Sequence, residues 1–212
     1  MMPSILTSAM ETIYGAVTMT TTPTQPEISL SYMVTGGSGF VGQRLVEMLV
    51  ERGANKVVSF DISPTPKDAM DSNKIEYVRG DLTNLEEVSK ACVGIDVVYH
   101  IAALVGPYHP KDSYKKVNYD GTLNVIEACK LNGIKRIVMS SSPSTRFPYP
   151  NPNIAGLTEA QLYEINNGDY TSVFLQPYAE TKAMGEKAMR DACGTKEEDL
   201  LTIAVAPHQV CV

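Results

Sequence analysis

The sequence predicts an α/β fold built on a doubly wound parallel sheet, and three observations support this prediction. Short apolar runs alternate with longer amphipathic segments, as in β-α-β units joined by right-handed crossovers. The run over residues 95–101 is almost continuously apolar, as a strand covered on both faces requires. A glycine-rich turn at residues 36–42 joins an apolar run directly to an amphipathic segment. The expected strand order is 3-2-1-4-5-6.

Strands and helices are expected in regular alternation along the chain. The predicted strands are residues 30–34, 56–61, 75–80, 95–101, 134–139 and 200–206. The first predicted helix starts at about residue 40 and ends before Gly53. Three more are predicted over residues 85–91, 111–132 and 178–192. Gly53 and Gly133 occupy positions where helices commonly end, and Pro177 occupies one where they begin. The stretch after Ser142 is rich in Pro, Asn and Gly and is predicted to be a loop excursion.

The glycine-rich turn has the Gly-x-Gly-x-x-Gly spacing at residues 37–42. Glycines allow a sharp turn, let the backbone approach a pyrophosphate, and let the helix pack closely on the strand. The pyrophosphate then lies at the helix N-terminus, where unpaired N–H groups and the helix dipole favour negative charge. Such spacing also occurs in ordinary turns, but here the strand before it and the helix after it supply the context of a dinucleotide-binding site. The residues expected to bind the cofactor there are Gly36, Gly39, Phe40, Val41 and Gly42.

Asp61 ends the second predicted strand, nineteen residues after Gly42. At this spacing in a Rossmann unit, an acidic side chain accepts hydrogen bonds from the adenosine ribose hydroxyls. The alternative is a turn aspartate or a helix cap. No Arg follows Asp61 directly to receive a 2′-phosphate, so the sequence favours NAD over NADP.

The composition excludes several classes of protein. The formal net charge is −6 and no Lys/Arg cluster forms, which argues against a nucleic-acid partner. No run reaches the roughly 18–20 apolar residues of a membrane span. The four cysteines are scattered without a Cys-x-x-Cys pair, so we expect reduced thiols in a cytoplasmic protein and no metal site.

Residues 1–29 are rich in Ser, Thr, Met and Pro and contain no Lys or Arg; the first basic residue is Arg44. A secretory signal or a mitochondrial presequence needs basic residues, so neither is indicated. We expect residues 1–29 to be a disordered leader and residues 30–212 to form one NAD-binding Rossmann domain.

Tyr178 and Lys182 are four residues apart on a predicted helix and therefore share a face. A solvated surface pair is the alternative, but this helix follows the fifth strand, which ends in the serine run 140–142. A tyrosine has a pKa of about 10, so it needs a nearby positive charge to act as a base near neutral pH. Lys182 and the nicotinium ring would supply that charge. Tyr178 would then take an alcohol proton as a hydride leaves for the nicotinamide, while a serine hydroxyl orients the oxygen.

Together these motifs resemble an extended short-chain dehydrogenase/reductase, and within that group the sequence is similar to the 3β-hydroxysteroid dehydrogenase family. Residues 178–182 and 202–208 look most like its sterol-4α-carboxylate 3-dehydrogenase (decarboxylating) branch. The similarity covers about residues 31–210. The matching motifs are residues 35–42, 80–82, 117–122, 140–142 and 178–182.

The resemblance implies a role for several individual residues. Ser142, Tyr178 and Lys182 correspond to the catalytic positions, with Ser141 as the reserve for Ser142. Tyr178 and Lys182 would also bind the cofactor, Lys182 through the nicotinamide ribose. Asp81 and Leu82 would flank the adenine. Ala102 and Ala103 would line the cofactor beyond the fourth strand, and Pro207 and His208 would border the nicotinamide. Two further expectations concern polar residues near strand ends. Asn118 would hold active-site backbone or be a polar residue on a helix flank, and His100 and His208 are expected to be strand-end residues rather than catalysts.

The implied activity is NAD-dependent oxidation of a 3β-hydroxysteroid or sterol. In the sterol branch the product is a β-keto acid, which loses carbon dioxide because the adjacent ketone accepts the electrons. The alternatives are an NAD-binding fragment without turnover and a sugar-nucleotide epimerase or dehydratase. A homodimer is a further expectation, as is association of a full-length form with the endoplasmic reticulum.

The sequence departs from the family pattern at its end. The family continues after the sixth strand with a Gly-Pro-Arg-like turn and a long substrate-binding segment, whereas here Cys211 and Val212 come last. We therefore expect the C-terminal substrate-binding part to be missing. We also expect an exposed apolar surface at that edge of the sheet.

Overall fold

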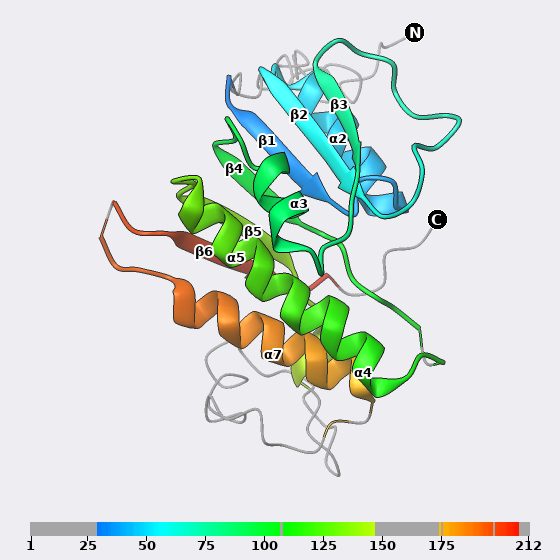
Figure 1. Ribbon diagram of the computed structural model, residues 1–212, viewed down its shortest axis with the longest axis vertical. Coiled ribbons are helices and arrows are strands. Elements are labelled where there is room, and N and C mark those ends of the chain that lie inside the picture. Colours follow the sequence, from blue (N-terminus) through cyan, green and yellow to red (C-terminus); the bar gives the residue numbers. More distant parts are fainter. Residues whose placement is uncertain (1–28, 107, 147–173, 175, 197, 208–212) are drawn as a thin grey trace, which may run out of the picture.

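A six-stranded parallel sheet organises the computed structural model, which describes residues 29–106, 108–146, 174, 176–196 and 198–207 (Figure 1). The strand order is β3-β2-β1-β4-β5-β6, so the predicted fold class and strand order are confirmed. The strands are β1 (Ser31–Thr35), β2 (Lys56–Asp61), β3 (Ile75–Arg79), β4 (Val97–His100), β5 (Arg136–Ser140) and β6 (Leu201–Val205). The predicted leader lies outside the described residues except for Ser29, and the predicted loop excursion is described only in part.

Helices cover both faces of the sheet, and side chains alternate between two apolar clusters. Met33 packs in the cluster beneath α3, α5 and α7, whereas its neighbours Tyr32 and Val34 pack in the cluster beneath α2. Figure 1 shows α2 behind the β1–β3 half, with α5 and α7 side by side on the opposite face. The helical elements are α2 (Phe40–Glu51), α3 (Leu85–Ala91), α4 (Lys111–Tyr114), η1 (Lys115–Asp120), α5 (Gly121–Leu131), η2 (Pro143–Arg146) and α7 (Pro177–Ala192).

The helix predicted over residues 111–132 is not one continuous α-helix. Its middle, η1, is a π-helical turn, a wider turn that accommodates one extra residue. Asn118 lies in this turn and is buried. The apolar spacing predicted a helix correctly, but it does not distinguish hydrogen bonds to residue i+4 from bonds to residue i+5.

The predicted helix boundaries are largely confirmed. Pro177 is the first residue of α7. Gly53 and Gly133 follow α2 and α5 with φ angles of 92° and 67°, the left-handed region that glycine adopts without strain. Asn84 caps α3 by accepting hydrogen bonds from the backbone N–H groups of Glu86 and Glu87.

The edge strand β6 has one half-buried face and one exposed face. Its inner side packs against α7, whereas Leu201, Ile203 and Val205 are 42%, 60% and 52% exposed. This is the apolar surface that the sequence predicted at this edge. Among the described helices none is long and apolar enough to cross a membrane. Within the same part of the chain, no three His, Cys, Asp or Glu side chains are grouped to hold a metal ion.

The two faces of the sheet predict different costs for the same substitution. Ile137 on β5 is 1% exposed, so we expect Ile137→Ala to lower the free energy of unfolding by about 2–4 kcal/mol. Ile203→Ala, on the neighbouring strand, removes the same atoms from a 60% exposed side chain and should cost less than about 1 kcal/mol. Urea unfolding of both variants measures the difference. Equal losses would contradict the assigned sheet faces.

Candidate active site

A cavity of about 530 Å³ opens at the carboxyl ends of β1 to β4, beside the glycine turn. Its volume is that of a typical small-molecule site. The structure brings together here nearly all the residues that the sequence predicted to bind a cofactor. These are Gly36, Gly39, Phe40, Val41, Gly42, Asp61, Asp81, Leu82, Ala102 and Ala103.

The glycine turn is packed so closely that side chains have no room. Gly36 has a φ of 73°, and a Cβ atom on it would lie 2.8 Å from the backbone nitrogen of Ala102 at the end of β4. A Cβ on Gly42 would lie 2.0 Å from the carbonyl oxygen of Gly36. The turn is tied to β2 by a hydrogen bond of 2.8 Å from the N–H of Gly36 to the carbonyl oxygen of Phe60. Backbone therefore forms this wall of the cavity.

Asp61 links the turn to the second strand. Its Oδ2 accepts a hydrogen bond of 3.0 Å from the N–H of Ser38, and its Oδ1 accepts one of 2.8 Å from the N–H of Ser63. Asp61 is therefore a turn aspartate, the alternative role considered from sequence, and it also lines the cavity. A carboxylate has four lone-pair sites, so these two hydrogen bonds leave acceptor sites on Asp61 that a ligand in the cavity could use.

These residues fit a dinucleotide. Helix α2 begins at the cavity with no side-chain cap in the described part of the chain, so the N–H groups of its first turn suit a phosphate. The glycines leave space for a pyrophosphate, and the two carboxylates that the sequence assigns to the ribose and adenine, Asp61 and Asp81, line the same cavity.

The predicted catalytic residues come from two elements beyond β5. Tyr178 opens α7, Lys182 lies one turn further along the same helix, and Ser142 directly precedes η2. Burial raises the pKa of Tyr178, and a side-chain hydrogen bond with Ser142 opposes that rise. The side chains of Tyr178 and Ser142 are therefore neighbours in the structure.

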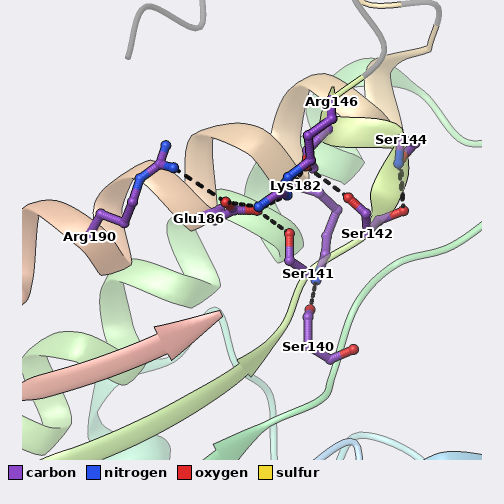
Figure 2. A network of polar contacts seen from close by, with 9 residues as sticks. Ser140, Ser141, Ser142, Ser144, Arg146, Lys182, Glu186 and Arg190 are labelled. Atoms are coloured by element: carbon purple, nitrogen blue, oxygen red, sulfur yellow. Dashed lines mark hydrogen bonds and ion pairs between the residues drawn. The ribbon is translucent and has the colours of Figure 1, made fainter. Parts of the chain in front are cut away.

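The two candidate serines have different environments. Ser141 is 5% exposed, and its hydroxyl donates to the carboxylate of Glu186. Ser142 is only half-buried and lies 2.8 Å, oxygen to oxygen, from the hydroxyl of Ser144 (Figure 2). The Ser141 hydroxyl is thus engaged by Glu186, whereas Ser142 is the serine next to Tyr178.

Lys182 is 2% exposed, and its ammonium donates a hydrogen bond of 2.5 Å to the carbonyl oxygen of Ser140. Burial lowers the pKa of Lys182 to about 8, and the charge of Glu186 opposes this change. The sequence predicted that Lys182 and the nicotinium ring together lower the pKa of Tyr178. In the structure burial dominates, and the pKa of Tyr178 is raised.

Two buried polar residues support the site. Asn118 accepts a hydrogen bond of 2.7 Å from the N–H of Leu104 and donates one of 3.0 Å to the carbonyl oxygen of the same residue. It therefore holds the backbone after β4, as one of the two sequence interpretations proposed. His100 is 1% exposed between the hydroxyls of Thr35 and Thr122, at 2.8 and 3.0 Å. Burial and the charge of Lys182 lower the pKa of His100 to about 3, so it is a neutral strand-end residue.

Three predicted cofactor residues are not among the described residues that line the cavity: Tyr178, Lys182 and Pro207. Pro207 is exposed just after β6, and His208 lies outside the described residues. The cavity also has walls that sequence reasoning missed. Most of these residues directly adjoin a predicted strand end, which is the signal that could have identified them. They are Phe60, Ile62, Ser63, Gly80, Ile101, Leu104, Val105 and Val117.

Comparison with known families gives a match over residues 33–211 to the 3-beta hydroxysteroid dehydrogenase/isomerase family. The chain belongs to this family. The chain spans only part of the two relatives described next: 51% of the length of the first and 43% of the length of the second.

A 2-alkyl-3-oxoalkanoate reductase of Stenotrophomonas maltophilia (strain K279a) is 36% identical over 181 residues, or 85% of this chain. The decarboxylating sterol-4-alpha-carboxylate 3-dehydrogenase of Homo sapiens is 35% identical over 177 residues, or 84% of this chain. Among solved structures, MoeE5 in complex with UDP-glucuronic acid and NAD has a TM-score of 0.64 at 29% identity. That alignment covers 83% of this chain and 54% of MoeE5.

The buried imidazole of His100 predicts a loss of stability in acid. Its pKa falls from 6.5 to about 3 on folding, so the unfolded chain binds the proton more readily. The stabilising effect is therefore complete above pH 6.5 and is lost as the pH falls toward 3. Between pH 7 and pH 5 we expect the free energy of unfolding to fall by about 2 kcal/mol from this group.

Urea unfolding of His100→Asn across the same pH range measures this contribution. We expect a flatter pH dependence than in the unsubstituted protein, because Asn does not titrate. His109→Asn is the control, since His109 is exposed and should leave the slope unchanged. A His100→Asn variant with the original slope would exclude His100 as the source.

Proposed function

We propose that this protein is an NAD-dependent dehydrogenase that oxidises the 3β-hydroxyl group of a steroid or sterol, with residues 30–212 as its NAD-binding domain. The observation that supports this most strongly is the proximity of the Tyr178 and Ser142 side chains at the carboxyl end of β5. Ligands of such sheets bind beyond the carboxyl ends of the strands. A tyrosine paired with a serine at that place suits proton transfer from an alcohol.

The cavity supports the cofactor part of the proposal. The glycine turn and the start of α2 would bind the pyrophosphate, Asp61 the adenosine ribose, and Asp81 with Leu82 the adenine. Ala102 and Ala103 would line the path toward the nicotinamide. MoeE5, the structural relative at 29% identity, is a complex with NAD.

When bound, NAD would supply the nicotinamide that accepts a hydride. Ser142 would donate a hydrogen bond that orients the substrate oxygen, and the phenolate oxygen of Tyr178 would take the alcohol proton. Burial raises the pKa of Tyr178, so the phenolate needs a nearby positive charge to form near neutral pH. Lys182, on the same face of α7, would provide it and would also bind the nicotinamide ribose.

The names of the relatives narrow the substrate class. A 2-alkyl-3-oxoalkanoate and a sterol 4-carboxylate oxidised at carbon 3 each carry the carboxylate on the carbon adjacent to the oxygen-bearing carbon. We therefore propose a β-hydroxy acid of sterol type as the preferred substrate. Its oxidation gives a β-keto acid, from which carbon dioxide leaves readily because the ketone accepts the electrons.

A second candidate function is a sugar-nucleotide epimerase or dehydratase that uses the same three catalytic residues. It is favoured by the likeness to MoeE5, whose complexes contain UDP-glucuronic acid or UDP-glucose together with NAD. Incubation with NAD and a 4α-carboxy-3β-hydroxysterol, or with a UDP-sugar, distinguishes the two functions. NAD reduction with the sterol supports the dehydrogenase, and conversion of the sugar supports the epimerase. NAD binding without either reaction would indicate the non-catalytic alternative.

Removal of the proposed base tests the mechanism. In Tyr178→Phe we expect kcat for sterol oxidation to fall at least about 100-fold, because the proton acceptor is lost. Dissociation of NAD, measured by calorimetry, should change by less than about threefold, since the glycine turn is untouched. Turnover is followed by the absorbance of the reduced nicotinamide.

The matched control is Tyr119→Phe, which removes a hydroxyl from a tyrosine whose ring lies beneath Lys115 on η1. It should keep its full turnover. Undiminished oxidation by Tyr178→Phe would rule out Tyr178 as the base.

The acidic residue at the end of β2 predicts the choice of cofactor. Asp61→Asn should weaken NAD binding about tenfold, because a charged acceptor for the ribose hydroxyls is lost. It should weaken NADP binding less, because the repulsion of a 2′-phosphate is lost as well. Calorimetric titration with both dinucleotides tests this, with the exposed Asp71→Asn as control. An unchanged preference between the dinucleotides would contradict the proposed ribose contact.

A further inference from the structure

Helix α7 presents a charged row along one face. Tyr178, Lys182, Glu186 and Arg190 follow one another at intervals of four residues, so they lie on the side turned toward the end of β5. Lys182 and Glu186 are both only 2% exposed. Charged side chains this deeply buried need partners, because their desolvation is costly.

The carboxylate of Glu186 is the centre of the network in Figure 2. Arg146 binds it through both terminal nitrogens, at 2.5 Å to Oε2 and 2.6 Å to Oε1. The hydroxyl of Ser141 donates to the same carboxylate, and Thr145 and Arg190 contact it at 3.4 and 3.5 Å. Glu186 therefore joins α7 to the segment 141–146.

These contacts bracket Ser142. Glu186 holds Ser141 on one side of it and Thr145 with Arg146 on the other. The turn is closed by the Thr145 hydroxyl, which donates a hydrogen bond of 2.8 Å to the carbonyl oxygen of Ser142. The position of the Ser142 side chain thus depends on a carboxylate that does not itself touch it.

Glu186 also acts on the charge of Lys182. The titratable or charged groups around Lys182 are Tyr178 and Glu186 on the same face of α7, and His100 on β4, whose pKa Lys182 lowers; Arg146 on η2 binds Glu186. Of these, the Glu186 carboxylate raises the pKa of Lys182 and so opposes the effect of burial. The bidentate Arg146 partly neutralises that carboxylate.

We propose that Glu186 and Arg146 are a positioning pair that fixes Ser142 and sets the charge of Lys182 in this site. The pair binds neither substrate nor cofactor in this proposal. Its effect on turnover rests on the proposed dehydrogenase function, whereas its effect on Lys182 does not.

The two substitutions predict opposite shifts. Glu186→Gln removes a negative charge, so the pKa of Lys182 should fall by about one unit. Arg146→Gln removes a positive charge and leaves the carboxylate less neutralised, so the pKa of Lys182 should rise by about half a unit. The control is Asp191→Asn, which changes an exposed acid of the same helix and should leave the pKa of Lys182 unchanged.

Nuclear magnetic resonance of the full chain, with lysine labelled at Cε, measures the pKa without substrate or cofactor. Lys182→Met assigns the resonance. A pKa shift of the same sign in both variants, or no shift in either, would overturn the proposal. If the pair had a purely structural role, the two substitutions would not move the pKa of Lys182 in opposite directions. If Glu186→Gln does not fold, Arg146→Gln alone decides by the presence or absence of the rise.

Turnover provides the second measurement. The alkaline limb of the kcat profile should move about one pH unit toward acid in Glu186→Gln and about half a pH unit toward alkali in Arg146→Gln. Glu186→Asp retains the charge and should restore the original limb. If no sterol or sugar is turned over, the proposed function fails while the titration of Lys182 still tests the pair. If the alkaline limb of the kcat profile stays fixed while the pKa of Lys182 shifts, the proposed role of Lys182 in turnover is wrong.

Discussion

The site depends on a close contact between two pieces of backbone, the glycine turn after β1 and the end of β4. A Cβ on Gly36 would lie 2.8 Å from the backbone of Ala102, and one on Gly42 only 2.0 Å from the carbonyl oxygen of Gly36. Because no side chain fits at these positions, the strand ends, α2 and the loop after β4 together enclose one cavity. The parallel sheet makes this possible, since it brings four strand ends to the same edge.

Much of this architecture could be predicted from the sequence because local patterns encode it. Apolar runs gave six strands, and the rule for doubly wound sheets gave their order. The glycine spacing and the distance to Asp61 located most of the cavity wall. These are short-range features, in which residue spacing alone determines the geometry.

The parts that could not be predicted depend on contacts between distant residues. Glu186 and Arg146 are forty residues apart, and Arg146 lies in a stretch that the sequence predicts to be a loop. The choice between Ser141 and Ser142 likewise depends on which hydroxyl turns toward Glu186. Burial of Tyr178 also reversed the expected direction of its pKa shift, since desolvation is a property of the packed fold.

The π-helical turn η1 fixes the number of residues that this segment must contain. Val117 lines the cavity, and Asn118 next to it holds the backbone of Leu104. Loss of one residue would convert the wide turn into an ordinary α-helical one and rotate everything before it by about 100° relative to α5. Amino-acid exchanges are compatible with η1 at many positions, whereas a one-codon deletion would turn both side chains away from their partners.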